Sequence, residues 1–381
     1  MTDAAADGAG GRPAASPDPA ASPLPGAVRG EEWARAVTEL DRAGEVCLAC
    51  HVRPDGDALG SMLAVAHALA GRGRGRVIAS FGDRPFQVPA MLRFLPGLDL
   101  LSPADAFPER PALMMTFDVA SVDRLGLLAA SALRAGQLIV VDHHASNPGF
   151  GTINLIDPAA AATAVLAAEL IDLLGVELTV PIAAGLYTGL VTDTGSFKFA
   201  TTPQVHQLAA RLIETGLDPD VFARELMDRA PFGYLRMLSA ALGRAVLEPG
   251  QARGHGLVWT TVTRQDRAGG QLPYEAAESV IDVVRRTGEA EVAVVFKQAD
   301  DGCWHVSARS KGQVDVARAC MALGGGGHSR AAGFSTCGTV PEALTRLRAL
   351  LAADPDGTGP VPARPGPVIA AAARAARDGG R

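Results

Sequence analysis

The chain has 381 residues, of which 48% are hydrophobic and 20% are charged, with a formal net charge of -6 and a pI near 5.8. This length allows two packed domains, because single hydrophobic cores stop growing below roughly 300 residues. The net negative charge argues against a protein whose basic surface binds long duplex nucleic acid, so any nucleic-acid substrate should be short and held locally.

Both ends of the chain are predicted to be disordered tails. Residues 1–28 are dominated by Ala, Pro, Gly, Ser and Asp, and residues 354–381 are similar with added Arg. Such segments bury too little apolar surface to offset the entropy lost on ordering. We therefore expect a catalytic domain with a helical connector over residues 29–235 and a second domain over residues 236–353.

The sequence predicts no membrane segment. No stretch of about 18 apolar residues is free of charge, and the N-terminus lacks a basic segment followed by an apolar run. We therefore expect a cytoplasmic protein without a membrane partner.

The cysteines are odd in number and lie within or beside apolar runs: Cys47, Cys50, Cys303, Cys320 and Cys337. This pattern indicates reduced, mostly buried thiols. The first two form a C-x-x-C, but no second pair completes a zinc site, and the residues around them alternate as a buried strand does.

Four apolar runs in the N-terminal half are predicted strands, over residues 46–52, 77–81, 113–117 and 138–141. Their near-continuous apolarity and the helical patterns between them predict an α/β fold, with a parallel sheet covered by helices on both faces. In such sheets the functional site lies at the carboxyl ends of the strands.

Acidic and histidine residues gather at the ends of these apolar runs. They are His51, Asp55 and Asp57 after the first run, Asp118 after the third, Asp142, His143 and His144 after the fourth, and Asp193 after a further apolar stretch. Each alone would be read as a helix cap, a turn aspartate or a core histidine, but four such clusters argue against coincidence. Carboxylates are costly to bury without a positive partner, and carboxylate with imidazole suits Mn, Fe or Mg. The set predicts a divalent-metal site.

The C-terminal half begins with a helical pattern over residues 203–247 and continues as a β-containing segment from about residue 255. Residues 292–296 and 304–307 are predicted to form a hairpin around Asp300-Asp301-Gly302. We expect a smaller mixed α/β domain here, with the active site in the cleft between the two domains.

Four glycines precede His328 and follow a predicted helix over residues 314–323: Gly324, Gly325, Gly326 and Gly327. The run is either a flexible connector or a loop whose bare N–H groups approach a phosphate or a base. In the second interpretation, His328 and Arg309 would supply the charge that anchors a terminal nucleotide.

Together these residues resemble the DHH phosphoesterase superfamily, whose naming motif is Asp142-His143-His144 here. The resemblance covers roughly residues 30–350, in the order H-x-x-P-D-G-D-x-x-G-S, D-x-x-S, D-H-H-x-S-N-x-x-F-G and T-D-T-G-S-F. The glycine-His328 segment is similar to the signature of the DHH-associated domain, and Arg309-Ser310 is similar to its substrate-binding pair. The nearest subgroup that it resembles is the bacterial nanoRNase and 3′-phosphoadenosine-5′-phosphate (PAP) phosphatase type.

This resemblance implies two divalent ions, with manganese expected and magnesium as the alternative. The implied ligands are His51, Asp55 and Asp118 for one ion, and Asp57, Asp118, His143 and Asp193 for the other, with Asp118 as the bridge. Asp142 would orient its neighbours, and His144 would face the phosphate or the leaving group. Relatives often carry Arg at the position of Lys198, so a substrate contact there is in doubt.

The implied activity is that of a two-metal phosphoesterase. It would cleave short oligoribonucleotides and linear dinucleotides such as pApA to 5′-mononucleotides, and PAP to AMP and phosphate, with cyclic dinucleotides as further candidates. We also expect a homodimer. Two alternatives remain: a manganese inorganic pyrophosphatase, which would lack the four-glycine-His motif, and a non-catalytic nucleotide sensor, which would tolerate loss of a ligand. The charge balance disfavours a processive single-strand exonuclease.

Overall fold

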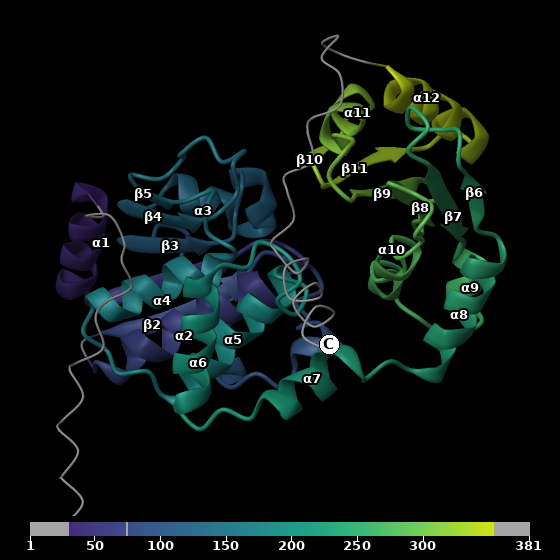
Figure 1. Ribbon diagram of the computed structural model, residues 1–381. Helices are drawn as coiled ribbons and strands as arrows, with labels where there is room; N and C mark the ends of the chain where they lie inside the picture. The colour runs from purple at the N-terminus through teal and green to yellow at the C-terminus, as the bar shows by residue number, and fades with distance from the viewer. Residues whose placement is uncertain (1–29, 74, 354–381) are drawn as a thin grey trace, which may run out of the picture. The chain divides into compact units, whose positions relative to one another are not determined.

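The computed structural model describes residues 30–73 and 75–353, and these form two compact units (Figure 1). The units divide between Arg229 and Ala230, earlier in the chain than the domain boundary expected after residue 235. The two predicted tails lie outside the described residues, and the cleft expected between the domains stays a prediction. No helix in the described ranges is long and apolar enough to cross a membrane.

The N-terminal unit is built on a five-stranded sheet, which is entirely parallel, as the sequence predicted. Its strands are β1 Glu45–Cys50, β2 Arg76–Phe81, β3 Leu113–Phe117, β4 Gln137–Asp142 and β5 Ile153–Ile156, in the order β2-β1-β3-β4-β5. The sequence did not predict β5, because this edge strand has only four residues and alternates between buried and half-buried positions.

Helices cover both faces of this sheet. They are α1 Glu31–Arg42, α2 Gly56–Gly71, α3 Ala129–Leu133, α4 Thr163–Leu173, α5 Val180–Asp193, α6 Pro203–Glu214 and α7 Pro219–Met227, with short 3-10 helices η1 Ala90–Leu92, η2 Leu98–Leu100, η3 Ala104–Ala106 and η4 Val122–Leu128. Val46, Leu48 and Cys50 of β1 point into the core shared with α2, α4 and α5. Cys47 and Ala49 point into the opposite core, beneath η4 and α3. This alternation explains why the strands are apolar on both sides.

Two glycines allow α2 and α5 to approach each other closely. A Cβ atom at Gly60 would lie 2.3 Å from the carbonyl oxygen of Gly185, and a Cβ atom at Gly185 would lie 2.4 Å from that of Gly60. The two backbones can therefore touch only because neither residue has a side chain. The contact joins the helix that carries Asp57 to the helix that ends at Asp193.

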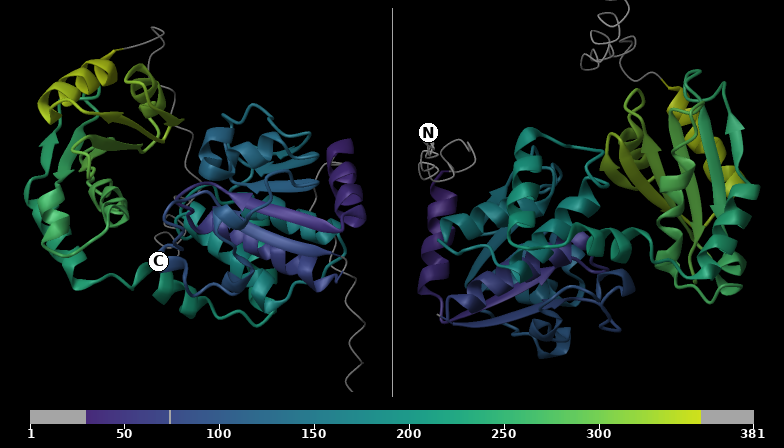
Figure 2. Two further views of the ribbon diagram at one scale, coloured as in Figure 1. Left: turned by 180° about the vertical axis from the view of Figure 1, so that it is seen from behind. Right: turned by 60° about the horizontal axis from the view of Figure 1, so that its bottom comes forward.

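The C-terminal unit is the predicted smaller mixed α/β domain. Its six strands are β6 Val246–Glu248, β7 Leu257–Val262, β8 Val292–Gln298, β9 Trp304–Ser310, β10 Gly326–His328 and β11 Ala331–Thr336, in the order β10-β11-β9-β8-β7-β6. Its helices are α8 Phe232–Gly243, α9 Arg264–Ala268, η5 Tyr274–Ala277, α10 Val280–Val284, α11 Val316–Ala322 and α12 Val340–Ala352. The predicted hairpin is confirmed as the antiparallel pair β8–β9, while β7 and β8 run parallel. Helices α8 and α10 pack on one face of the sheet, and α11 and α12 pack on the other (Figure 2).

Two local predictions for this unit are wrong, and a predicted helix is confirmed with a later start. Residues 246–248 form strand β6 instead of ending a helix, because they pair with β7. Gly326 and Gly327 lie in the edge strand β10, which pairs with β11, and not in a loop. The helix expected from residue 314 begins at Val316, because the side chain of Asp315 caps it by accepting from the N–H groups of Ala317 and Arg318.

Cys303 and Cys337 are joined by a disulfide, so the prediction of reduced thiols is wrong for this pair. The two residues are 34 positions apart, and their spacing gave no hint of a bridge. The antiparallel pairing of Trp304 in β9 with Thr336 in β11 brings them together, since each cysteine is the next residue beyond that pair. The other three cysteines are free and buried, as predicted: Cys47, Cys50 and Cys320.

Candidate metal centre

The carboxyl ends of β1, β3 and β4 and the end of α5 bring the predicted metal ligands into one cluster. Three sets of side chains each place their ligand atoms within 4.8 Å of one another: His51, Asp55 and Asp118; Asp57, His143 and Asp193; and Asp118, His143 and His144. The donors are carboxylate oxygens and imidazole nitrogens without a thiolate. This donor chemistry fits divalent cations such as Mn²⁺ or Mg²⁺.

Asp118 lies at the centre of this cluster. It follows β3 with a φ angle of 60°, in the left-handed region that aspartate tolerates better than most residues. Its N–H donates to the carbonyl oxygen of Val141 at 3.0 Å, which fixes the turn against β4. Its Oδ2 lies 3.4 Å from Nε2 of His51, and its Oδ1 lies 3.5 Å from Nε2 of His143. Each carboxylate oxygen therefore faces a different imidazole, an arrangement that suits a ligand shared by two ions.

The two imidazoles of His51 and His143 are turned so that Nε2 faces the cluster. Nδ1 of His51 lies 2.8 Å from the carbonyl oxygen of Val52, and Nδ1 of His143 lies 3.3 Å from that of Ala160. Because a carbonyl oxygen only accepts, each Nδ1 is the donor in these contacts. Metal-ligating histidines are usually held by their second ring nitrogen in this way.

Asp55 divides its two carboxylate oxygens between the fold and the site. Its Oδ1 caps α2 by accepting from the N–H of Ala58 at 3.0 Å, and its Oδ2 lies 3.7 Å from Nε2 of His51. Asp55 therefore caps the helix and still directs one oxygen towards the cluster.

Asp57 is completely buried, and both of its oxygens meet the start of α4. They accept from the N–H groups of Thr163 at 2.6 Å and Ala164 at 2.9 Å. Burial, together with the negative charges of Asp193 and Asp118, raises the pKa of Asp57 well above its ordinary value. The surroundings of Asp57 therefore favour an additional positive charge next to this carboxylate.

The carboxylates also stabilise positive charge on the imidazoles. Burial alone would lower the pKa of His51, but Asp118 and Asp55 raise it to about 10. Burial would also lower the pKa of His143, but nearby carboxylates, mainly Asp193, raise it to about 10. Oδ2 of Asp193 lies 3.1 Å from Nε2 of His143. Carboxylates outnumber imidazoles in the cluster, so it attracts cations.

Asp142 ends β4 and orients the two histidines that follow it. Its Oδ1 accepts from the backbone N–H of His143 at 2.9 Å and lies 2.7 Å from Nδ1 of His144. Its Oδ2 accepts from Nδ2 of Asn147 at 2.6 Å. Although burial raises the pKa of Asp142, these hydrogen bonds from His144 and Asn147 hold it below its ordinary value. Asn147 is thus a positioning residue that the sequence analysis did not single out.

Thr163 is a second residue of the centre that the sequence did not indicate. It is completely buried, its N–H donates to Oδ2 of Asp57, and its hydroxyl donates to Oδ1 of Asp118 at 3.0 Å. One residue thus holds a carboxylate from each set of predicted ligands. It follows the alanine-rich run 159–162, where no acidic or histidine residue could have drawn attention to it.

Arg309 and His328, the predicted substrate-binding cations, lie in one row of the C-terminal sheet. Arg309 of β9 pairs with Ala331 of β11, and Ala331 pairs with His328 of β10. Directly opposed residues project to the same face, so the two side chains flank the small Ala331. Burial lowers the pKa of Arg309, and no carboxylate in the described ranges forms an ion pair with it.

The side chain of Ser310 is buried inside the same unit, where it forms a structural hydrogen bond. Its side chain is only 2% exposed, and its hydroxyl donates to Oε1 of Glu291 at 2.8 Å. The structure therefore does not bring Ser310 to the face that carries Arg309. Lys198 is exposed beyond the end of α5 and forms no ion pair with any described residue.

Three of the four positions before His328 require glycine, because of a positive φ angle or a close approach of another backbone segment. Gly324 and Gly327 have φ angles of 83° and 133°, and a Cβ atom at Gly325 would lie 2.0 Å from the carbonyl oxygen of Gly333. Gly326 has neither constraint, because a Cβ atom there would meet nothing within 4 Å. Gly326 is therefore the member of the run that borders open space with ordinary backbone geometry.

Comparison with known proteins agrees with this arrangement. Residues 45–190 match the DHH family, N-terminal domain, and residues 264–353 match the DHHA1 domain. The bifunctional oligoribonuclease and PAP phosphatase NrnA of Thermus thermophilus is 36% identical over 314 residues, which cover 81% of this chain and 89% of that protein. The cyclic-di-AMP phosphodiesterase GdpP of Geobacillus thermodenitrificans is 27% identical over 84% of this chain and 49% of GdpP.

A solved structure shares the fold. The crystal structure of an exopolyphosphatase-related protein from Bacteroides fragilis superposes with a TM-score of 0.75 at 21% identity, covering 84% of this chain and 95% of that chain. One conclusion follows from the two domain matches and from the identity to NrnA over most of both chains, and the shared fold is consistent with it. The chain belongs to the DHH family of phosphoesterases, with a DHHA1 domain as its second domain.

Proposed function

We propose that this protein hydrolyses short oligoribonucleotides and linear dinucleotides such as pApA to 5′-mononucleotides, and PAP to AMP and phosphate. The observation that carries the proposal is the position of Asp118, whose two oxygens face His51 and His143 in two different ligand sets. The identity to NrnA over most of both chains supports the choice of substrates. Cyclic dinucleotides are a second candidate substrate class, supported by the similarity to GdpP.

Two divalent ions are part of this proposal, with manganese as the expected metal. His51, Asp55 and Asp118 would hold one ion, and Asp57, Asp118, His143 and Asp193 would hold the other. A bound pair of this kind lowers the pKa of a water molecule and stabilises the charge that develops on the phosphate oxygens. Imidazole ligands among the carboxylates favour Mn²⁺ over Mg²⁺, which prefers oxygen ligands and its own waters.

The chain itself contributes proton transfer and orientation near the ligands. Nδ1 of His144 donates to Asp142, so any proton that His144 gives to a leaving oxygen comes from Nε2. Asp142 is in turn fixed by Asn147, whose amide also donates to the carbonyl oxygen of Val119 at 3.0 Å. This chain of hydrogen bonds holds the imidazole of His144 in one orientation before a substrate arrives.

Arg309 and His328 are proposed to hold the terminal phosphate or nucleotide of the substrate. Arg309 is partly withdrawn from water without a carboxylate partner in the described ranges, so a substrate phosphate can supply the missing negative charge. Gly326, which borders open space on β10, the strand that also carries His328, leaves room for a flat base or a sugar.

The test is a substrate panel with the purified protein. PAP, pApA, a 5′-phosphorylated tetra-adenylate, a cyclic dinucleotide and pyrophosphate are incubated with Mn²⁺ or Mg²⁺, and the products are separated by chromatography. Formation of AMP from PAP and pApA in the presence of Mn²⁺ is the expected result. Hydrolysis of pyrophosphate alone, or of no compound, would contradict the proposal. The homodimer and the cytoplasmic location stay predictions, and light scattering of the purified protein tests the first.

A further inference from the structure

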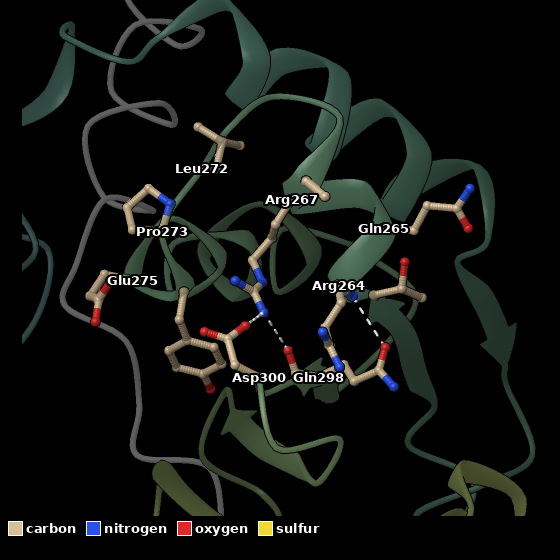
Figure 3. Close-up of a pocket in the computed structure, with 11 residues that line it drawn as sticks. Arg264, Gln265, Arg267, Leu272, Pro273, Glu275, Gln298 and Asp300 are labelled. Atoms are coloured by element: carbon tan, nitrogen blue, oxygen red, sulfur yellow. Dashed lines mark hydrogen bonds and ion pairs between the residues drawn. The ribbon is translucent and has the colours of Figure 1, made fainter.

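The C-terminal unit contains a pocket that the metal centre and the row of Arg309 and His328 do not use. It has a volume of about 970 Å³ and lies between α9, residues 272–275 and the turn that follows β8 (Figure 3). This volume is at the upper end of the range of roughly 300–1,000 Å³ that is typical of small-molecule sites. The pocket is therefore large enough for a nucleotide.

Arg267 lies beneath this pocket with only 4% of its surface exposed. Its Nη2 donates to the carbonyl oxygen of Gln298 at 2.9 Å and to Oδ1 of Asp300 at 2.8 Å, and its guanidinium lies 5.4 Å from the centre of the Tyr274 ring. Its Nε is buried and has no hydrogen-bond partner among the described residues. The charge of Arg267 is paired with Asp300, but a buried N–H without an acceptor is rare and costly, so the Nε–H points to a ligand at this place.

Arg264 supplies a second guanidinium at the rim of the pocket. Figure 3 shows its side chain extending from α9 towards the end of β8, beside Gln298. Asp300 already pairs with Arg267, whereas the guanidinium of Arg264 forms no ion pair with any described residue. The side-chain oxygen of Gln298 accepts from the N–H of Arg264 at 3.2 Å, so its amide nitrogen can donate to a ligand.

The opposite wall of the pocket is formed by the apolar and aromatic Leu272, Pro273 and Tyr274, with the carboxylate of Glu275 beside them. An unneutralised guanidinium suits a phosphate, an apolar wall suits the face of a base, and side-chain amides suit the edge of a base. The combination therefore fits a nucleotide better than an inorganic anion or an apolar molecule.

The pocket adjoins the sheet face that carries Arg309. Alternate residues of β9 project to one face, so His305, Ser307 and Arg309 share it, and the ring of His305 meets that of Tyr274 edge-on at 5.5 Å. From His305 to Arg309 the strand advances by about 13 Å. The paired residues of β11 on this face, Ala331, Gly333 and Ser335, are small and uncharged. Neither strand carries an acidic side chain on this face. The carboxylates whose charge acts on Arg309 belong to Asp282 of α10 and to Glu278, which pairs with Lys297.

We propose that this pocket is a distal nucleotide subsite, which holds the far nucleotide of an oligoribonucleotide whose other end is bound at Arg309. The inference rests on the proposed function, because it assumes that Arg309 anchors a substrate. PAP has a single nucleoside and does not span β9 from Arg309, whereas the two nucleotides of pApA span about the distance from Arg309 to His305 and end before the pocket. Oligonucleotides of about four residues reach the subsite and gain affinity from it.

The test compares Arg264→Glu with the wild type and with the matched variant Arg346→Glu. Arg346 is also exposed, but it lies on α12, which packs on the opposite face of the same sheet. Binding of 5′-phosphorylated tetra-adenylate, pApA and PAP is measured by fluorescence anisotropy in EDTA, where metal-dependent cleavage is absent. KM and kcat are then measured with Mn²⁺. Thermal melting checks that each variant is folded, and Arg264→Ala serves as a milder second variant.

Arg264→Glu is expected to weaken binding of the tetranucleotide by about ten-fold or more, as loss of a charge-assisted phosphate contact should, while PAP and pApA keep their affinity. Its KM for the tetranucleotide should rise without a change in kcat. Equal weakening for all three ligands, the same effect in Arg346→Glu, or no effect would overturn the subsite. A wild type that binds the tetranucleotide through Arg264 but cleaves no nucleotide would instead contradict the proposed function and leave the subsite standing.

Discussion

Some residues of the candidate metal centre have both a role in the backbone structure and a proposed role as a ligand, which limits the substitutions that these positions tolerate. Asp118 is both a residue with a positive φ angle and the carboxylate shared between two imidazoles. Asp55 is both a helix cap and a candidate ligand. A change at either position therefore alters the backbone unless the replacement keeps the shape of the side chain. Asp118→Asn is the appropriate variant, since asparagine also tolerates the left-handed region.

Thr163→Val tests whether the buried hydroxyl positions the bridging carboxylate. Valine keeps the shape and the N–H that donates to Asp57, but it removes the donor to Asp118. Loss of such an outer partner typically weakens metal binding about 10- to 100-fold, and we expect this range here. Mn²⁺ binding is measured by electron paramagnetic resonance or titration calorimetry.

Thr163→Ser is the matched control, because it restores the hydroxyl while losing only a methyl group. Its Mn²⁺ affinity should return to within a few fold of the wild type. Equal weakening in both variants would show that Thr163 acts through packing of its methyl group and not through the hydrogen bond to Asp118.

At the scale of elements, close contact between α2 and α5 is what brings the two halves of the ligand set together. Gly185→Ala places a Cβ atom 2.4 Å from the carbonyl oxygen of Gly60, so the helices must separate. We expect a loss of about 1–3 kcal/mol in the free energy of unfolding, as for other overpacked contacts. Urea unfolding measures it. Gly71→Ala, at the open end of α2, is the control, and it should leave stability unchanged or slightly raised.

The disulfide between the ends of β9 and β11 can be tested by counting thiols. Burial raises the pKa of Cys47 to about 12 and that of Cys320 to about 11, so neither forms a thiolate at pH 8 in the folded protein. A thiol reagent should find almost no reactive cysteine in the native chain, three after unfolding without reductant, and all five after reduction. Five reactive thiols without reductant would show that Cys303 and Cys337 are not bridged.

The main strands could be predicted because each is a long apolar run. The short strands could not, because they form only by pairing with other strands. The first four strands are apolar on both sides because helices cover both faces, and the sequence shows this directly. Strands β5, β6 and β10 have three or four residues and form only because a neighbouring strand is present. The charged ligands stood out at strand ends, whereas Thr163 acts through an N–H and a hydroxyl that any buried threonine possesses.

In the whole molecule, the candidate metal ligands and the predicted substrate-binding residues belong to different units. Every candidate ligand lies before Arg229, and Arg309 and His328 lie after Ala230. Arg309→Ala and His328→Ala should therefore keep the metal content unchanged. Each should weaken nucleotide binding by roughly 10- to 150-fold, from the loss of about 1.5–3 kcal/mol of charge-assisted contact.

Elemental analysis and KM values for PAP and for a minimal chromogenic phosphodiester check this separation of roles. The small ester has no second group to reach the C-terminal unit, so its turnover should change least. Loss of metal in either variant, or equal losses for both substrates, would show that the two residues do not act as a substrate clamp.

Metal titration of the metal-free protein tests the central claim, a centre of two ions bridged by Asp118, most directly. Mn²⁺ is added stepwise while the number of ions bound per chain and the rate of AMP formation from pApA are recorded on the same samples. The rate is predicted to rise only as occupancy goes from one ion to two, and Asp118→Asn is predicted to bind fewer than two ions and to lose at least about 100-fold in rate. Full activity at one ion per chain, or an active Asp118→Asn that binds two ions, would contradict it.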